Sequence, residues 1–146
     1  MGVTRFAHVG VVAEDLDAMA EFLTALGFAC GERWRVGGEL VERVIGVREP
    51  RAEAFMARTP DGSGEIEVAR FVAPTDGGSA DPAAPSNRPG IRHLCYQDDD
   101  VRATVERARA LGYDTVGDVV DYEGTYLLCY VRGPEGLIVE LAQPLR

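Results

Sequence analysis

A pattern that occurs twice along the chain constrains the fold more than any other feature. His8 lies 19 residues before Gly27, which stands within Leu-Gly-Phe, and His93 lies 19 residues before Gly112, which stands within Leu-Gly-Tyr. Each histidine belongs to an apolar run typical of a strand, and each glycine follows apolar residues at helical spacing. Self-similarity over this distance indicates one structural unit used in tandem.

Each histidine is followed by the signals of a helix start. Asp15 stands seven residues after His8 and can cap a helix that ends at Gly27. In the second copy, Asp99 or Asp100 can cap the corresponding helix. The apolar residues at helical spacing are Leu16, Met19, Ala20, Leu23 and Leu26 in the first copy, and Val101, Val105, Ala108 and Leu111 in the second.

Strand-like stretches fill the remainder of each copy. We expect strands near 5–13, 28–37, 40–47, 53–59, 65–73, 92–97, 115–121, 125–131 and 137–142. Residues 74–90 are rich in Pro and Gly and are typical of a linker or a long surface loop. The sequence therefore predicts one α+β domain over 1–146, in which βαβββ modules over 1–73 and 91–146 are joined by the linker over 74–90.

A glutamate occupies an equivalent place in the last strand of each module. Pro-Asp-Gly precedes Glu67 and Pro-Glu-Gly precedes Glu140, with one extra residue in the first copy. If the modules pair around a pseudo-two-fold axis, these glutamates converge with His8 and His93. Two imidazoles and two carboxylates suit a borderline divalent metal ion that keeps open positions.

Each of these four residues also has a simpler interpretation. A lone strand histidine is more often a core or surface residue than a ligand, and a glutamate between Ile and Val usually faces solvent. The equivalence of all four positions within the repeat favours the metal site. The side chains of Cys95 and Gln97 share the face of His93 by strand alternation, so we expect them to line a pocket. Aromatic walls are expected from Trp34, Tyr122 and Tyr126.

Composition excludes several classes of function. The net charge of −9 and the pI of about 4.7 give no electrostatic basis for binding nucleic acid or an anionic membrane. The chain has no lysine, which excludes Schiff-base chemistry and a Walker-type lysine. Three cysteines without a CxxC motif indicate a reduced compartment. No apolar run approaches the length of about 20 residues that spans a bilayer, and no signal peptide is apparent, so we expect a cytoplasmic protein.

The repeated motifs resemble the vicinal oxygen chelate superfamily, which includes glyoxalase I, methylmalonyl-CoA epimerase, extradiol dioxygenases and the bleomycin and fosfomycin resistance proteins. The resemblance rests on HVGVVAEDLDAMAEFLTALGF, TPDGSGEIEVARF, IRHLCYQDDDVRATVERARALGY and GPEGLIVELAQ. It implies a cupped mixed sheet around a divalent ion such as Zn, Ni, Co, Mn or Fe, with the helices outside. The implied ligands are His8, Glu67, His93 and Glu140, with Glu65 as an alternative to Glu67.

The ligand set is nearest to glyoxalase I-like and methylmalonyl-CoA epimerase-like members. The resemblance implies an isomerase or lyase that abstracts a proton next to a metal-bound carbonyl of a small oxygenated substrate, with Glu140 or Glu67 as base. Glu42 or Glu39 lies where the epimerases carry a further acid, although both glutamates also suit a solvated turn. The alternatives are a non-catalytic drug-binding or metabolite-binding protein and an extradiol-type dioxygenase. Small members of the superfamily are commonly homodimers.

Overall fold

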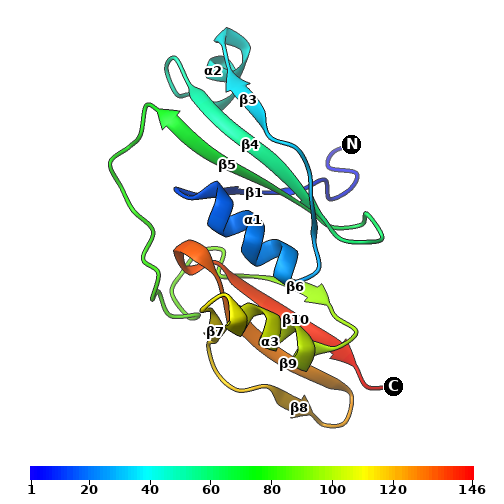
Figure 1. Ribbon diagram of the computed structural model, residues 1–146. Coiled ribbons are helices and arrows are strands. Elements are labelled where there is room, and N and C mark those ends of the chain that lie inside the picture. Colours follow the sequence, from blue (N-terminus) through cyan, green and yellow to red (C-terminus); the bar gives the residue numbers. More distant parts are fainter. The chain divides into compact units, whose positions relative to one another are not determined.

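Each copy of the repeat folds as a unit with its own sheet (Figure 1). A computed structural model describes residues 1–146 and divides them into unit 1, Met1–Gly78, and unit 2, Ser79–Arg146. The elements of unit 1 are β1 (Val9–Val12), α1 (Leu16–Ala25), β2 (Ala29–Cys30), β3 (Trp34–Gly37), α2 (Glu39–Ile45), β4 (Arg51–Arg58) and β5 (Glu65–Ala73). Those of unit 2 are β6 (His93–Gln97), α3 (Val101–Ala110), β7 (Asp114–Thr115), β8 (Val120–Tyr122), β9 (Tyr126–Arg132), a 3-10 turn (Pro134–Gly136) and β10 (Ile138–Pro144).

The two sheets repeat one topology. In unit 1 the order is β1-β5-β4, and β2 and β3 pair with successive parts of the outer edge of β4. In unit 2 the order is β6-β10-β9, and β7 and β8 pair with β9 in the same way. The first strand of each unit runs parallel to the last, and the other pairings are antiparallel. The predicted α+β class and its two βαβββ modules are confirmed.

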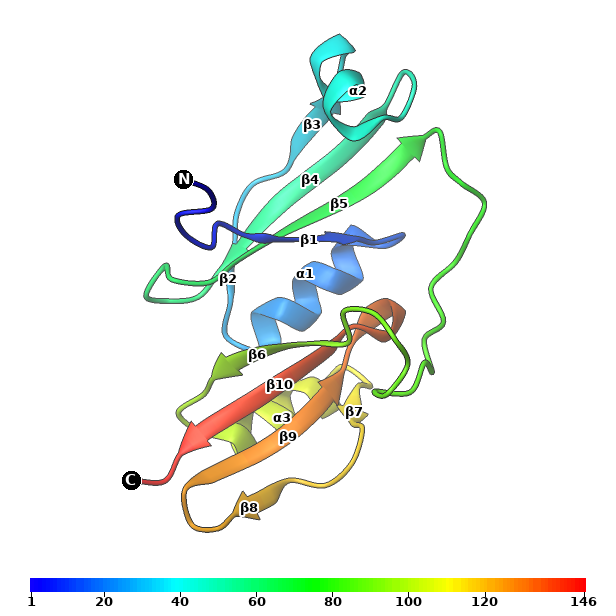
Figure 2. The ribbon, with the colours of Figure 1, turned by 180° about the vertical axis from the view of Figure 1, so that it is seen from behind.

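One long helix covers one face of each sheet (Figure 2). In unit 1 the fully buried side chains of Met19, Phe22 and Leu23 from α1 pack with those of Phe55 and Ile66. In unit 2 the side chains of α3 pack against β9 and β10. The buried residues of that core are Val101, Val105, Ala108, Val131, Val139 and Leu141. The opposite face of each sheet is free of its own helix, and it carries the polar residues discussed below.

The predicted helix boundaries are confirmed at both copies of the repeat. The Asp15 carboxylate accepts a hydrogen bond from the Ala18 N–H at 3.0 Å. The Asp100 carboxylate accepts the corresponding bond from Ala103 at 3.0 Å, so Asp100 rather than Asp99 is the cap of α3. Such caps satisfy N–H groups that have no partner within the helix.

The prediction of a strand over 40–47 is wrong, because this stretch forms helix α2. Its apolar residues fall in pairs four positions apart, which fits a helical turn as well as a strand, and Gly46 ends the helix at φ 73°. The outer edge of β4 is already paired with β2 and β3, so no sheet edge is left there for another strand. No residue of α2 is buried.

Two further expected strands are interrupted. The strand expected over 28–37 is divided into β2 and β3, and the one expected over 115–121 is divided into β7 and β8. In both units the two short strands pair with different parts of one long neighbour, so the break follows from the repeat. No helix or strand lies between Ala73 and His93.

Candidate metal and substrate site

The polar residues of unit 1 lie on the sheet face that points away from α1. On β5, Ile66 is fully buried, whereas Glu65 and Glu67 on either side of it are partly exposed. Glu67 lies beside Gly10 of the parallel strand β1. His8 directly precedes β1, is exposed, and falls on the same face by alternation. His8 and Glu67 therefore share a face, although no ion pair joins them.

The two candidate carboxylates of unit 1 differ in their partners. The Arg58 guanidinium of β4 forms an ion pair with Glu65, with 2.9 Å between Nε and Oε1. Glu67 lies opposite Met56 and makes no ion pair. A carboxylate already bound by a guanidinium has fewer lone pairs left for a metal ion. The geometry therefore favours Glu67 over Glu65 as the ligand.

In unit 2 the repeat-equivalent residues are in direct contact. Parallel pairing of β6 and β10 sets Cys95 beside Glu140, two residues after His93 on the same face. The Nε2 atom of His93 lies 3.1 Å from Oε2 of Glu140. The side chains remain 38% and 20% exposed, so both can reach a ligand that approaches the open face.

The neighbouring side chains complete a polar cluster around this pair. Tyr130 lies opposite Glu140 on the antiparallel strand β9, and its hydroxyl is 3.3 Å from Nδ1 of His93. Burial raises the pKa of the Cys95 thiol, and the charge of Glu140 and a hydrogen bond to it add to this effect. Burial also raises the pKa of Tyr130, and the charge of Glu140 raises it further. Both groups therefore keep their protons at neutral pH.

The donor atoms of unit 2 fit a divalent ion. Two ligands that bind one ion at about 2.1 Å, at right angles, are themselves about 3 Å apart. The separation of 3.1 Å between Nε2 of His93 and Oε2 of Glu140 matches this spacing. Within neither unit do three or more His, Cys, Asp or Glu side chains gather to hold a metal ion. Each unit by itself contains two of the four expected ligand residues, and their role as ligands stays a prediction.

The expected substrate-lining residues occupy the same kind of face. Gln97 follows Cys95 on β6 by strand alternation and is exposed. Tyr122 of β8 pairs with Tyr126 of β9, and both rings are exposed. Trp34 of β3 is 40% exposed at the edge of the other sheet. These residues are accessible, and their role in substrate binding stays a prediction.

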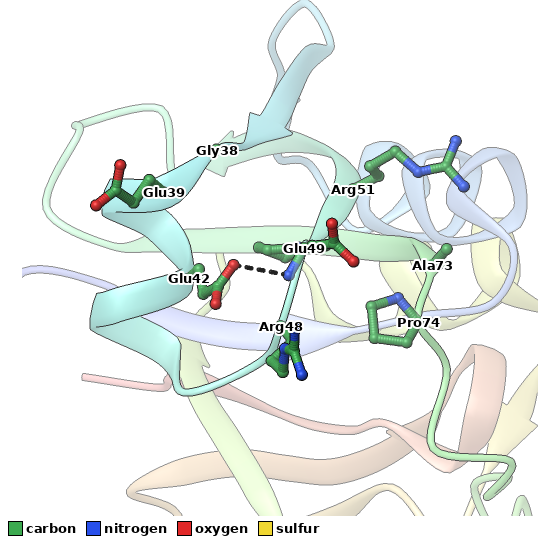
Figure 3. Close-up of a pocket in the computed structure, with 9 residues that line it drawn as sticks. Gly38, Glu39, Glu42, Arg48, Glu49, Arg51, Ala73 and Pro74 are labelled. Atoms are coloured by element: carbon green, nitrogen blue, oxygen red, sulfur yellow. Dashed lines mark hydrogen bonds between the residues drawn. The ribbon is translucent and has the colours of Figure 1, made fainter.

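Glu42 and Glu39 lie apart from the glutamates of the sheet. Both line a pocket between α2 and the ends of β4 and β5, which Arg48 and Arg51 also line (Figure 3). The Glu42 carboxylate accepts a hydrogen bond from the Glu49 N–H at 2.9 Å, and so closes the loop after α2. The pocket includes Ala73, six residues along β5 from Glu67, a distance of about 20 Å in a strand. Within unit 1 the structure does not bring Glu42 and Glu67 together.

Tyr130 is the residue of the cluster that no motif of the sequence indicates. It belongs to the alternating run of Tyr126, Leu128 and Tyr130, so its face could be inferred from the sequence. Its contact with His93 depends on the register of β9 against β10, which fixes Tyr130 opposite Glu140. That register was not deducible from the spacing of the motifs.

Comparisons with known proteins agree with this architecture. The model of the Glyoxalase/Bleomycin resistance protein/Dioxygenase superfamily matches residues 5–141. A glyoxalase family protein from Bacillus cereus has 36% sequence identity and a TM-score of 0.91, with 100% of this chain and 97% of that chain covered. No curated protein matched the sequence. The chain belongs to the glyoxalase and bleomycin resistance superfamily, also called the vicinal oxygen chelate superfamily, as its motifs predicted.

More distant structures share the fold alone. The fosfomycin resistance protein FosX from Listeria monocytogenes has 15% identity and a TM-score of 0.62, with 98% of this chain and 95% of that chain covered. A FosX variant in complex with Mn(II) and 1S,2S-dihydroxypropylphosphonic acid has 14% identity and a TM-score of 0.60, with 97% and 90% covered. No helix of the present chain is long and apolar enough to cross a membrane.

Proposed function

We propose that the protein is a divalent-metal-dependent enzyme of the glyoxalase type, whose metal ligands are His8, Glu67, His93 and Glu140. The observation that carries the proposal is the His93–Glu140 pair on the open face of its sheet, with donor atoms 3.1 Å apart. His8 and Glu67 occupy the repeat-equivalent positions on the open face of the other sheet. A FosX variant, which shares the fold, was crystallised in complex with Mn(II).

The proposed reaction is proton transfer next to a carbonyl group of a small substrate that carries vicinal oxygens. Held by these four residues, a divalent ion would supply Lewis-acid stabilisation of the negative charge that develops on the carbonyl oxygen. Glu140 is partly exposed and accepts protons at its carboxylate, so it can take the proton from the carbon next to the carbonyl. The protonated carboxyl group of Glu140 then returns the proton to the neighbouring atom of the substrate, and Glu67, which makes no ion pair, is the alternative base.

Metal binding tests the ligand set with a matched pair of variants. Glu67→Gln should weaken the binding of Zn, Ni, Co or Mn strongly, because it removes a charged oxygen ligand. Glu65→Gln, two residues away on the same face, should leave the affinity unchanged, because Arg58 already occupies that carboxylate. Titration calorimetry and elemental analysis should find one ion per four-ligand set in the wild type and none in His93→Ala. Loss of binding in Glu65→Gln instead of Glu67→Gln would reassign the ligand.

Isotope exchange tests the chemistry. In D2O the metal-loaded protein should incorporate deuterium next to the carbonyl of α-hydroxy or α-oxo substrates, as read by NMR. Glu140→Gln should lower that rate about 10²–10⁴-fold, the usual loss when a catalytic base is removed. Tight binding of oxygenated ligands with no exchange across a broad panel would favour the sequestering alternative. Oxygen uptake with catechols, dependent on iron, would favour the dioxygenase alternative.

The same proposal includes a small oxygenated substrate and a homodimeric assembly. The open face of unit 2 combines polar groups with exposed aromatic rings, as sites for small polar ligands do. Light scattering after size-exclusion chromatography measures the mass directly, and a mass of one 15.8-kDa chain would contradict the dimer.

A further inference from the structure

Tyr130 contacts His93 at the ring nitrogen that Glu140 does not contact. Its hydroxyl oxygen lies 3.3 Å from Nδ1 of His93, while Glu140 lies 3.1 Å from Nε2. The two rings also pack against each other, with centroids 4.8 Å apart and an interplanar angle of 32°. Each nitrogen of the His93 ring therefore has one polar partner.

The position of Tyr130 is fixed by the backbone. Pairing of β9 with β10 sets Tyr130 directly opposite Glu140, and pairing of β6 with β10 sets Cys95 beside Glu140. The neighbours of Tyr130 along β9, Cys129 and Val131, point to the other face and are buried in the core. The backbone pairing and the two buried neighbours therefore fix the hydroxyl of Tyr130 close to Nδ1 of His93.

The contact matters because the two nitrogens of a neutral imidazole ring share one proton. A neutral histidine carries one proton, and it can bind a metal ion through Nε2 only when that proton is on Nδ1. An N–H group at Nδ1 needs a hydrogen-bond acceptor, and in metal-bound histidines this N–H commonly donates a hydrogen bond to a neighbouring oxygen. A phenol hydroxyl can donate or accept a hydrogen bond. It can therefore donate to Nδ1 when the ring proton is on Nε2 and faces Glu140, and accept from Nδ1 when the proton is on Nδ1.

We propose that Tyr130 is a positioning residue for His93, whose hydroxyl forms a hydrogen bond with Nδ1 and so holds the ring in the orientation that presents Nε2 to Glu140 and to a metal ion. The metal part of this inference rests on the proposed function, because it takes His93 as a ligand. The orientation of His93 by Tyr130 in the metal-free protein does not depend on it.

The variant Tyr130→Phe isolates the hydroxyl, because it keeps the aromatic ring that packs on His93. Tyr126→Phe is the matched control, since Tyr126 lies four residues earlier on the same strand and face. The chain has two histidines, so the ring nitrogens give two sets of ¹⁵N resonances, and His8→Gln assigns them. Circular dichroism and a melting curve confirm that both tyrosine variants fold.

In the metal-free protein, Tyr130→Phe should shift the Nδ1 resonance of His93, because that nitrogen loses its hydrogen bond, and should leave His8 unchanged. The Kd for Zn²⁺ should rise about tenfold or more, which is the usual effect of removing such a partner. In the Zn-loaded protein, the Nδ1 proton of His93 should exchange faster with water. Tyr126→Phe should show none of these changes.

The outcomes separate this inference from the proposed function. If Tyr130→Phe leaves both the His93 resonances and the Kd at wild-type values, Tyr130 has no positioning role. A shifted resonance with an unchanged Kd would equally overturn the role in metal binding. If the wild type binds no metal ion at all, the proposed function fails, and the metal-free resonances alone decide whether Tyr130 orients His93.

Discussion

At the scale of single residues, Asp61 shows how local hydrogen bonds lower the pKa of a carboxyl group. Its Oδ1 atom accepts bonds from the Thr59 hydroxyl at 2.7 Å, the Ser63 N–H at 3.0 Å and the Ser63 hydroxyl at 2.9 Å. These bonds, that of Thr59 first, lower the pKa of Asp61 from 3.8 to about 2. They favour the ionised carboxylate and so hold the turn between β4 and β5.

A pH-dependent contribution to stability follows from this shift. The folded protein binds the Asp61 proton more weakly than the unfolded chain, so the contribution is complete above pH 3.8 and is lost as the pH falls through about 2. The free energy of unfolding of Asp61→Asn should therefore fall below that of the wild type at neutral pH and approach it near pH 2. Denaturant unfolding at several pH values measures the difference.

The exposed Asp118 provides the control for this measurement, because its side chain makes none of these hydrogen bonds. Asp118→Asn should change the free energy of unfolding little at any pH. A difference between Asp61→Asn and the wild type that stays constant down to pH 2 would show that the carboxylate charge is not what the turn requires.

At the scale of elements, the turn before β10 depends on one glycine. Gly136 has φ 78°, and a Cβ atom there would lie 2.8 Å from the Asp81 carbonyl oxygen and 3.1 Å from Cα of Pro82. Gly136→Ala should lower the free energy of unfolding by about 1–3 kcal/mol, because the backbone is strained for any other residue. Gly117→Ala, which meets nothing within 4 Å, should leave stability nearly unchanged. Equal effects of the two variants in chemical denaturation would contradict this.

The sequence predicted some elements well and others poorly, for reasons that the packing makes plain. Helices α1 and α3 were recognisable because each combines a capping aspartate, an apolar stripe that is buried, and a closing glycine. The sequence predicts a strand where α2 forms, because seven residues of mixed pattern, none of them buried, carry too little periodicity to distinguish a helix from a strand. Its assignment depends on which sheet edges are already paired, which no local pattern reveals.

The candidate site follows the same division. The repeat predicted that His93 and Glu140 share a face, and the structure brings their side chains into contact. The choice between Glu65 and Glu67 needed the Arg58 ion pair, which depends on the antiparallel register of β4 and β5. The contact of Tyr130 with His93 is not predictable for a similar reason, since strand alternation gives the face of Tyr130 but not its partner.

At the scale of the whole molecule, the two units carry separate spectroscopic probes. The single tryptophan, Trp34, belongs to unit 1. All five tyrosines belong to unit 2, and they are Tyr96, Tyr113, Tyr122, Tyr126 and Tyr130. Tryptophan fluorescence therefore reports the unfolding of unit 1, and near-ultraviolet tyrosine absorbance reports that of unit 2.

If one metal ion binds the four proposed ligands, it should stabilise both signals together. An ion that binds only the folded protein raises the free energy of unfolding by about 2.7 kcal/mol when its free concentration is roughly 100 times the Kd. We expect this gain with Zn²⁺ in the Trp34 and the tyrosine transitions alike. His8→Gln, a change in unit 1, should abolish the gain in the tyrosine transition of unit 2 as well as in unit 1. If the tyrosine gain survives His8→Gln, the ion binds without His8, and the four-ligand set is wrong.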